Sequence, residues 1–217
     1  MGITVIFISQ DTCLEICGIP DGGNPEIAKG ASAGSGGQKA LSLAWRKVVR
    51  EAVSEWSGLS QSQLTFSSDP GGKPNILGPD GKTRLSYQFN ASHTKGGVVM
   101  ALRPDAPVGI DIESRDRRVE WLDLARRYLP AEDLNEILQS SPDGHRTEFI
   151  RRWTRLEAIL KMQGDGVQKL FNESWKADAH KQFRDTLFLY PNSEFIVCLA
   201  SRDIGKTPLT QVELLPG

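Results

Sequence analysis

The pattern of hydrophobic and polar residues predicts short strands grouped around helices. A continuous run of β-branched and aromatic residues predicts a strand over Ile3 to Ile8. Gly18 to Gln38 holds few large apolar residues and many Gly, Ala, Ser and Pro, a composition typical of a loop. Apolar residues then recur at helical spacing from Lys39 to Trp56, and Gly58 supplies a stop for that helix.

The rest of the chain has a strand-rich middle, a helical region and a second strand-rich region. Turns separate the middle strands, which we expect at Leu85 to Phe89, Gly97 to Leu102 and Val108 to Glu113. Helical patterns follow around Glu120 to Tyr128, Pro130 to Gln139, with Pro130 in the first turn, and Arg146 to Gln163. Later strands are expected at Phe183 to Tyr190, Glu194 to Ala200 and Leu209 to Leu214.

Strands and helices that are segregated in this way predict an α+β fold rather than a parallel α/β sheet. The 217 residues suffice for one large domain or for two small ones packed together. Two α+β halves, residues 1–104 and 105–217, explain the order of elements. The halves are similar in layout, although no internal repeat can be read directly from the residues.

Composition limits the classes of function and the cellular compartment that we expect. The formal net charge of −1 argues against a domain whose main task is binding nucleic acid, since such domains carry a basic excess. Cys13, Cys17 and Cys198 show no zinc spacing and predict reduced thiols. No apolar run approaches the roughly 20 residues of a membrane helix, and the N-terminal strand lacks a basic lead-in. We therefore expect a cytoplasmic protein without a membrane partner.

The segment Pro107 to Glu113 carries the first candidate chemistry. Side chains alternate along a strand, so Val108, Ile110 and Ile112 point into a core while Gly109, Asp111 and Glu113 point the other way. Two carboxylates on one face repel each other, and a divalent cation would offset that repulsion. Gly109 would leave room for a ligand to approach. The alternative is an exposed face with two solvated acids.

A helical segment supplies a third carboxylate. Trp153, Leu156 and Leu160 form a core stripe, while Glu157 and Lys161 lie four residues apart on one face. Alone, this is an ordinary surface pair. Combined with the acid pair on the strand, Glu157 would complete a site of hard oxygen ligands suited to magnesium.

Two further pieces offer contacts for phosphate. Ser92 and His93 are expected just after a strand, where a hydroxyl and an imidazole could both reach a phosphate oxygen, although a lone histidine is more often structural. Upstream, Gly71-Gly72-Lys73-Pro74 places a lysine in a rigid turn, a common sequence that is weak evidence by itself.

Taken together and in this order, these pieces resemble the larger, surfactin-synthetase-type class of 4′-phosphopantetheinyl transferases. The likeness runs from Lys73 to Lys161 and includes the glycine pair Gly164 and Gly166. Each block alone is weak evidence for the family, but four blocks in the correct order are a specific match. The blocks are Gly72-Lys73-Pro74, Phe89-Asn90-Ala91-Ser92-His93, Val108-Gly109-Ile110-Asp111-Ile112-Glu113, and Trp153-Thr154 with Glu157-Ala158 and Lys161.

The resemblance implies a pseudo-twofold monomer with coenzyme A between its halves. It implies a Mg²⁺-dependent attack by a serine of an apo acyl or peptidyl carrier protein on the β-phosphorus of coenzyme A, with 3′,5′-ADP leaving. Magnesium ligands would be Asp111, Glu113 and Glu157, with Glu157 also the candidate general base. Phosphate contacts would be Lys73 beside Pro74, Ser92, His93 and Lys161, the last steadying the pyrophosphate.

The chain departs from the family pattern in places. Leu156 replaces the lysine that usually precedes the helix glutamate, so we expect one positive charge fewer near the phosphates. Lys39 and Arg46 are candidates for the 3′-phosphate by location only. Arginines that could steer an acidic carrier protein, or form an ordinary solvated face, are Arg115, Arg117, Arg118, Arg126, Arg127, Arg151, Arg152 and Arg155.

Two other functions remain open from the sequence. A magnesium nuclease would share the acid cluster, but it would need a basic groove and aromatic platforms that a charge of −1 and 7% aromatic residues do not favour. A relative with little activity could bind coenzyme A or a carrier protein and regulate it, a reading supported only by Leu156.

Overall fold

The computed structural model describes residues 2–9, 35–68, 73–172, 174–176, 178 and 185–214. The N-terminal elements are β1 (Ile3–Ser9), α3 (Ser35–Ser57), β2 (Thr65–Ser68), β3 (Pro74–Leu77), β4 (Gln88–Thr94) and β5 (Gly97–Arg103). The later elements are β6 (Val108–Ser114), α4 (Trp121–Tyr128), α5 (Ala131–Gln139), α6 (His145–Gln163), β7 (Thr186–Leu189), β8 (Phe195–Ser201) and β9 (Leu209–Leu214). Short 3₁₀ turns include η3 (Val167–Phe171).

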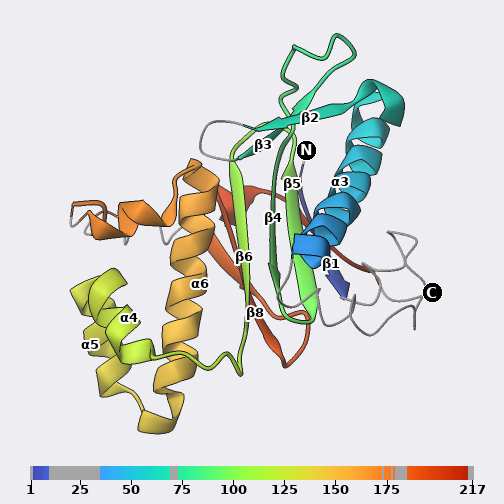
Figure 1. Cartoon of the computed structure of the whole chain (residues 1–217). Helices are drawn as coiled ribbons and strands as arrows, with labels where there is room; N and C mark the ends of the chain where they lie inside the picture. The colour runs from blue at the N-terminus through green and yellow to red at the C-terminus, as the bar shows by residue number, and fades with distance from the viewer. Residues whose placement is uncertain are drawn as a thin grey trace, which may run out of the picture.

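Two main sheets form the centre of the molecule. One has the strand order β4-β5-β1-β9, in which β9 pairs in parallel with β1 and the other pairs are antiparallel. The second is antiparallel with the order β6-β8-β7, and β2 pairs with β3 separately. Helix α3 lies along the first sheet, and α6 covers β6 and β8 with α4 and α5 outside it (Figure 1). The fold is therefore mixed α+β, as predicted.

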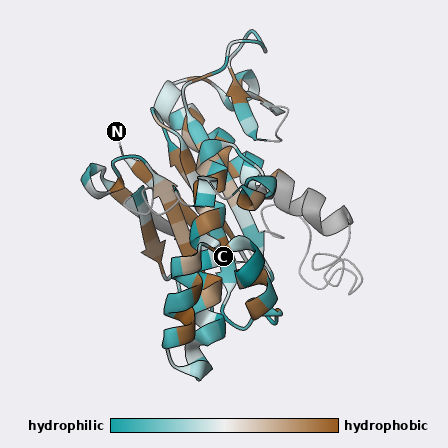
Figure 2. Cartoon of the chain, turned by 90° about the vertical axis from the view of Figure 1, so that its left-hand side faces the viewer, coloured by the Kyte–Doolittle hydropathy of each residue, from teal (hydrophilic) through white to brown (hydrophobic). Residues whose placement is uncertain are grey.

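Hydrophobic side chains fill the space between these layers. Alternate residues of β1 face opposite ways: Val5 and Phe7 contact the second sheet, whereas Ile6 and Ile8 pack under α3. Figure 2 shows hydrophobic residues mainly in the strands and many hydrophilic residues on the helices. The core between the two sheets contains Ile3, Val5, Phe7, Val99, Ala101, Val108, Ile110, Ile112, Leu189, Phe195, Val197 and Leu199.

Most predicted elements are present, with ends shifted by a few residues. The helix ending before Gly58 is confirmed, and Gly58 adopts a positive φ of 72° that favours glycine. Pro130 is the residue that caps α5 rather than a member of its first turn. The last four residues of the loop predicted over Gly18 to Gln38 belong instead to α3, which begins at Ser35. The rest of that loop, the predicted strand residues 183–184, Cys13 and Cys17 lie outside the described residues.

Three predictions in the middle of the chain need correction. The strand predicted at Leu85 to Phe89 begins at Gln88 and continues to Thr94, because the chain reverses only at Lys95 and Gly96, whose φ is 92°. Ser92 and His93 therefore lie within this strand and not after it. Strands β2 and β3 are absent from the sequence-based prediction, and Pro74 is the first residue of β3, where a proline is tolerated.

Candidate active site

Three carboxylates meet where β6 packs against α6. One oxygen from each of Asp111, Glu113 and Glu157 lies within 4.8 Å of the others. Asp111 and Glu113 project from the same face of β6, and both are buried, at 2% and 7% exposure. The predicted acid trio is thus brought together, and the alternative of two solvated acids on an exposed strand is wrong.

One carboxylate oxygen of Asp111 accepts hydrogen bonds, and the other accepts none. Its Oδ1 accepts hydrogen bonds from Ser92 Oγ of β4, at 2.8 Å, and from Lys161 Nζ of α6, at 2.6 Å. Lys161 Nζ also lies 2.8 Å from Ser92 Oγ. The Oδ2 atom is buried and has no hydrogen-bond partner. A buried carboxylate oxygen without a donor is costly, which leaves this atom suited to a cation.

Burial and repulsion between the carboxylates raise the pKa values of the other two acids. Burial, and then the nearby charge of Asp111, raises the pKa of Glu157 to about 8, while Lys161 opposes the shift. The same causes raise the pKa of Glu113 to about 7, against the lowering effect of Arg117, which donates a hydrogen bond to its Oε1. A positive charge placed among these oxygens would release both protons.

The residues fit a magnesium ion. They offer hard oxygen donors, among them the orphaned Oδ2 of Asp111, and they are few enough to leave coordination positions for water and phosphate. The neighbouring Lys161 ammonium offsets part of their charge. Asp111, Glu113 and Glu157 would therefore hold the ion.

Gly109 has a different role from the one predicted. A Cβ at this position would collide with Ala158 O and Met162 N of α6 and would lie 2.8 Å from Met162 Cα. The glycine thus allows the backbone of α6 to approach β6 closely, and there is no room for a ligand directly at Gly109. The close approach brings Glu157 and Lys161 of the helix to Asp111 on the strand.

Lys73 lies at the C-terminal end of α6. Its Nζ is 3.3 Å from Met162 O, so the ammonium donates to a carbonyl of the last helical turn, where a cation is favoured. Pro74 follows as the first residue of β3. Gly72 lies outside the described residues. Because Met162 also packs against Gly109, Lys73 stands near the start of β6.

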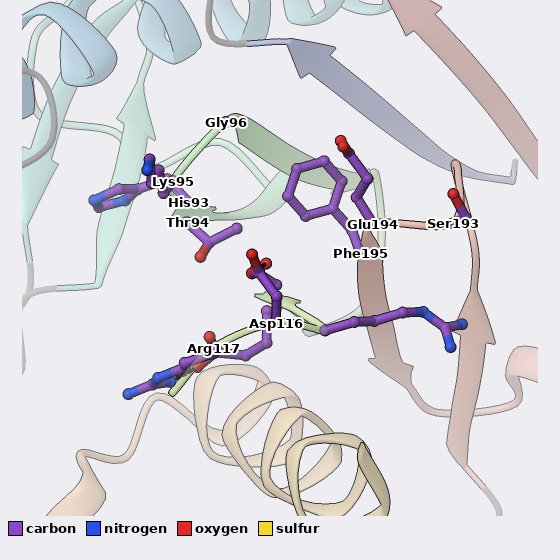
Figure 3. Close-up of a pocket in the computed structure, with 12 residues that line it drawn as sticks. His93, Thr94, Lys95, Gly96, Asp116, Arg117, Ser193, Glu194 and Phe195 are labelled. Atoms are coloured by element: carbon purple, nitrogen blue, oxygen red, sulfur yellow. Dashed lines mark hydrogen bonds and ion pairs between the residues drawn. The ribbon is translucent and has the colours of Figure 1, made fainter. Parts of the chain in front are cut away.

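A cleft of about 800 Å³ opens at the other end of β6. It is bounded by the β4–β5 turn, the segment after β6 and the residues before β8, and it includes Glu113 of the acid cluster. Figure 3 shows Gly96 beside the Phe195 ring, with Asp116 and Arg117 across the opening. The cleft lining is His93, Thr94, Lys95, Gly96, Glu113, Ser114, Arg115, Asp116, Arg117, Ser193, Glu194 and Phe195.

Ser92 and His93 leave β4 on opposite faces, as successive strand residues do. Ser92 is buried against Asp111, whereas the ring of His93 is exposed and borders the cleft. Partial burial, followed by the charge of Lys161, lowers the pKa of His93, and Asp111 opposes that shift. The ring is therefore largely neutral at pH 7.

The predicted arginines do not form one free surface. Arg152 is paired with Asp133 and Glu136 of α5, and Arg151 and Arg155 stack on Phe188. These contacts fix α6 against its neighbours and leave Arg115, Arg117 and Lys95 as the cations at the cleft. Arg46 stacks on Trp45 and Phe66, and the side chain of Lys39 is not described.

Leu156 and Cys198 belong to the core. Leu156 is fully buried with Leu160 on the face of α6 that packs on α4 and α5, so a side chain here points away from the acid cluster. The expectation that this replacement removes a charge beside the phosphates is therefore wrong. Cys198 is a free, buried thiol, as predicted, and burial raises its pKa to about 12.

Sequence reasoning named two further residues of the site but gave them no role in the acid cluster. Asn90 of β4 accepts a hydrogen bond from the Ile110 backbone N–H, at 3.0 Å, and Arg117 pairs with Glu113. The four-residue spacing from Glu113 to Arg117 was visible in the sequence. The contact of Asn90 joins residues 20 apart on different sheets, and no local pattern predicts it.

Comparison with known proteins shows which family this chain resembles. Residues 107–197, which hold β6, α6 and all three acids, match the model of the 4′-phosphopantetheinyl transferase superfamily. This segment of the chain is therefore similar to that superfamily. A 4′-phosphopantetheinyl transferase of Nostoc sp., HetI, is 36% identical over 58% of this chain and 53% of its own length. The Sfp protein of Bacillus subtilis is 30% identical over 55% of this chain and 50% of its own.

A vertebrate protein is similar to this chain as well. The L-aminoadipate-semialdehyde dehydrogenase-phosphopantetheinyl transferase of Xenopus laevis is 26% identical over 58% of this chain and 43% of its own length. The chain thus spans about half the length of the curated relatives it matches. The resemblance inferred from the sequence is confirmed, because the chain is similar to 4′-phosphopantetheinyl transferases of the Sfp type. In the part of the chain that the structure describes, no helix is long and apolar enough to cross a membrane.

Proposed function

We propose that this protein transfers the 4′-phosphopantetheine arm of coenzyme A to a serine hydroxyl of an apo acyl or peptidyl carrier protein and releases 3′,5′-ADP. The observation that carries the proposal is the trio of Asp111, Glu113 and Glu157 beside Lys161, with both strand acids buried, within a segment that matches the superfamily model. Relatives that share this segment are named as 4′-phosphopantetheinyl transferases.

The acid trio would hold a magnesium ion. When bound there, Mg²⁺ supplies positive charge that binds the diphosphate of coenzyme A and offsets the charge of the transition state. Lys161, already 2.6 Å from Asp111, adds a second positive charge beside the same phosphates and stabilises the leaving 3′,5′-ADP. The work of this chain is mainly positioning and electrostatics, as is usual in phosphoryl transfer.

Glu157 is the proposed general base. Without a cation, its pKa of about 8 keeps it mostly protonated at pH 7, and the positive charge of the loaded site lowers that pKa. The ionised carboxylate then accepts the proton of the attacking serine hydroxyl, directly or through a water. Its place on α6, one turn before Lys161, sets base and cation on the same side of the reacting phosphate.

Coenzyme A is proposed to lie along β6. Lys73 and Pro74 stand near the start of this strand and suit the nucleotide phosphates, with Ser92 and His93 as further contacts. The cleft at the other end shares Glu113 with the acid cluster and suits the pantetheine arm and the approaching serine. The diphosphate would then span the acids between them.

The two halves, residues 1–104 and 105–217, are proposed to be related by a pseudo-twofold axis. Support comes from a helix packed on a sheet in each: α3 on β5 and its neighbours, α6 on β6 and β8. Strand β9 departs from this division by pairing with β1. We also propose that the protein acts as a monomer, since Ser92, Asp111, Glu113, Glu157 and Lys161 all come from one chain.

The test is the intact mass of a purified apo carrier protein after incubation with this protein, coenzyme A and magnesium. We expect a gain of one phosphopantetheine that is lost with EDTA and lost when the acceptor serine is replaced by alanine. No gain with several acyl and peptidyl carriers, while coenzyme A still binds, would overturn the transferase proposal and favour a binding protein.

A further inference from the structure

The two main sheets meet where β4 runs beside β6, and side chains join them there. Each strand is an edge of its own sheet, so part of its backbone has no strand partner. Asn90 Oδ1 of β4 accepts the hydrogen bond of the Ile110 N–H of β6, at 3.0 Å, in a buried setting. The amide of one side chain thus replaces a strand-to-strand backbone bond.

This bond fixes the residue before the central metal ligand. Ile110 is fully buried in the core between the sheets, and Asp111 follows it with its carboxylate facing α6. A shift of the backbone at Ile110 would carry Asp111 with it. Because a misplaced ligand oxygen weakens a metal site, the partners that orient the ligands matter almost as much as the ligands.

Two residues of β4 hold Asp111 from one strand face. Asn90 and Ser92 alternate with Ala91, so both project toward β6: Asn90 fixes the backbone and Ser92 Oγ donates to Asp111 Oδ1 at 2.8 Å. With Lys161 on the same oxygen, Oδ2 is left to face the other acids. Asn90 itself is only 8% exposed and none of its atoms needs to contact a substrate.

We infer that Asn90 is a positioning residue of the metal centre, which sets the place of Asp111 by holding the Ile110 backbone. This inference rests on the proposed function, because it assumes that the acid cluster binds a divalent cation. It differs from a role in folding alone: loss of the Asn90 bond should weaken metal binding more than it weakens the fold.

The experiment measures Mg²⁺ binding to the purified full chain by calorimetry, together with melting temperature and the KM for magnesium. For Asn90→Ala we expect a dissociation constant at least about 10-fold higher, in the range found when residues that orient metal ligands are removed. The KM for magnesium should rise in parallel, with kcat at saturating metal little changed. Asn90→Asp keeps an acceptor oxygen in place and should retain most of the affinity.

Ser201→Ala is the matched control. Ser201 of β8 is fully buried, donates to Pro107 O and accepts from Arg103, so its loss removes buried hydrogen bonds near the start of β6. It should lower the melting temperature without changing metal affinity. If Asn90→Ala behaves like Ser201→Ala, the inference is overturned and Asn90 is structural. If the unaltered protein binds no divalent cation, the metal centre of the proposed function fails instead.

Discussion

Glu157 has the most demanding role among the single residues of the site. It must ligate a cation, accept a proton and lie beside Asp111, whose charge helps to raise its pKa to about 8. Replacing the carboxylate with an amide keeps its shape and removes the charge. We expect Glu157→Gln to lower carrier-protein modification at least ~100-fold, since the loss of a general base alone costs about 10²–10⁴ in rate.

The measurement is the initial rate of phosphopantetheine transfer at saturating coenzyme A and magnesium. Glu148→Gln is the control, because it makes the same change in the first turn of α6, where Glu148 forms ion pairs with Arg151 and Arg152 and is not part of the acid trio. Near-normal transfer by Glu157→Gln would contradict both roles given to the residue.

The same carboxyl groups predict how stability changes with pH. In the cation-free protein, the pKa of Glu113 is raised from 4.5 to about 7 and that of Glu157 from 4.5 to about 8. The folded state thus binds these protons more tightly than the unfolded state. Their contribution to stability is complete below pH 4.5 and declines as pH rises to about 8.

We therefore expect the melting temperature in EDTA to fall from pH 5.5 to pH 8.5 more steeply in the unaltered protein than in Glu157→Gln. Added magnesium should raise the melting temperature more at pH 8.5 than at pH 5.5, because the ligands are then already ionised. Equal slopes for the two proteins in EDTA would show that the Glu157 carboxyl is not held protonated by its surroundings.

At the scale of elements, the contact of β6 with α6 builds the site. Gly109 lets the helix backbone rest on the strand, and a methyl group there would collide with Ala158 and Met162. We expect Gly109→Ala to destabilise the fold by about 1–3 kcal/mol or more, as overpacking does, and to reduce magnesium affinity because α6 carries Glu157 away from Asp111.

Chemical denaturation and magnesium calorimetry measure the two effects of Gly109→Ala. Gly205→Ala is the control, since a Cβ at Gly205 meets nothing within 4 Å. If Gly109→Ala has the stability and affinity of the control, the close packing of α6 on β6 is not what positions the acids.

The elements also show what local sequence patterns can and cannot predict. Strands such as β5 and β6 were predicted correctly because they are rich in apolar residues, which the structure buries almost without interruption. Strands β2 and β3 were missed because each has only four residues, with mixed burial. The acid trio and Lys161 were found from period-two and period-four spacing and from family resemblance. The contact of Asn90 with Ile110 was not predicted, because it is defined only by how β4 and β6 meet.

Gly109 shows a second limit. A glycine beside acids suggests either room for a ligand or a close approach of backbone, and the sequence alone cannot distinguish these. The structure shows that Gly109 allows close packing of α6, because Ala158 and Met162 occupy the space beside it. Leu156 was likewise expected to lie near the phosphates because it precedes Glu157 in the sequence. One step along a helix, however, turns a side chain by about 100° onto another face.

At the scale of the molecule, the two proposed halves share one core. The cluster between the sheets takes Val5, Phe7 and Val99 from residues 1–104, and Ile110 and Val197 from residues 105–217. Strand β9 also pairs with β1, so the C-terminal segment completes the N-terminal sheet. Each half alone would expose this hydrophobic surface and leave β1 or β9 without its partner.

We therefore expect fragments 1–104 and 105–217, expressed separately, to be unfolded or aggregated, and to recover α+β circular dichroism and transferase activity only when they are co-expressed. The acid trio lies within 105–217, but Asp111 depends on Ser92 and Asn90 of the first fragment, so the isolated C-terminal fragment should also bind magnesium poorly. An isolated C-terminal fragment that unfolds cooperatively and binds magnesium as the full chain does would show that the halves are independent domains and that β4 is dispensable for the metal centre.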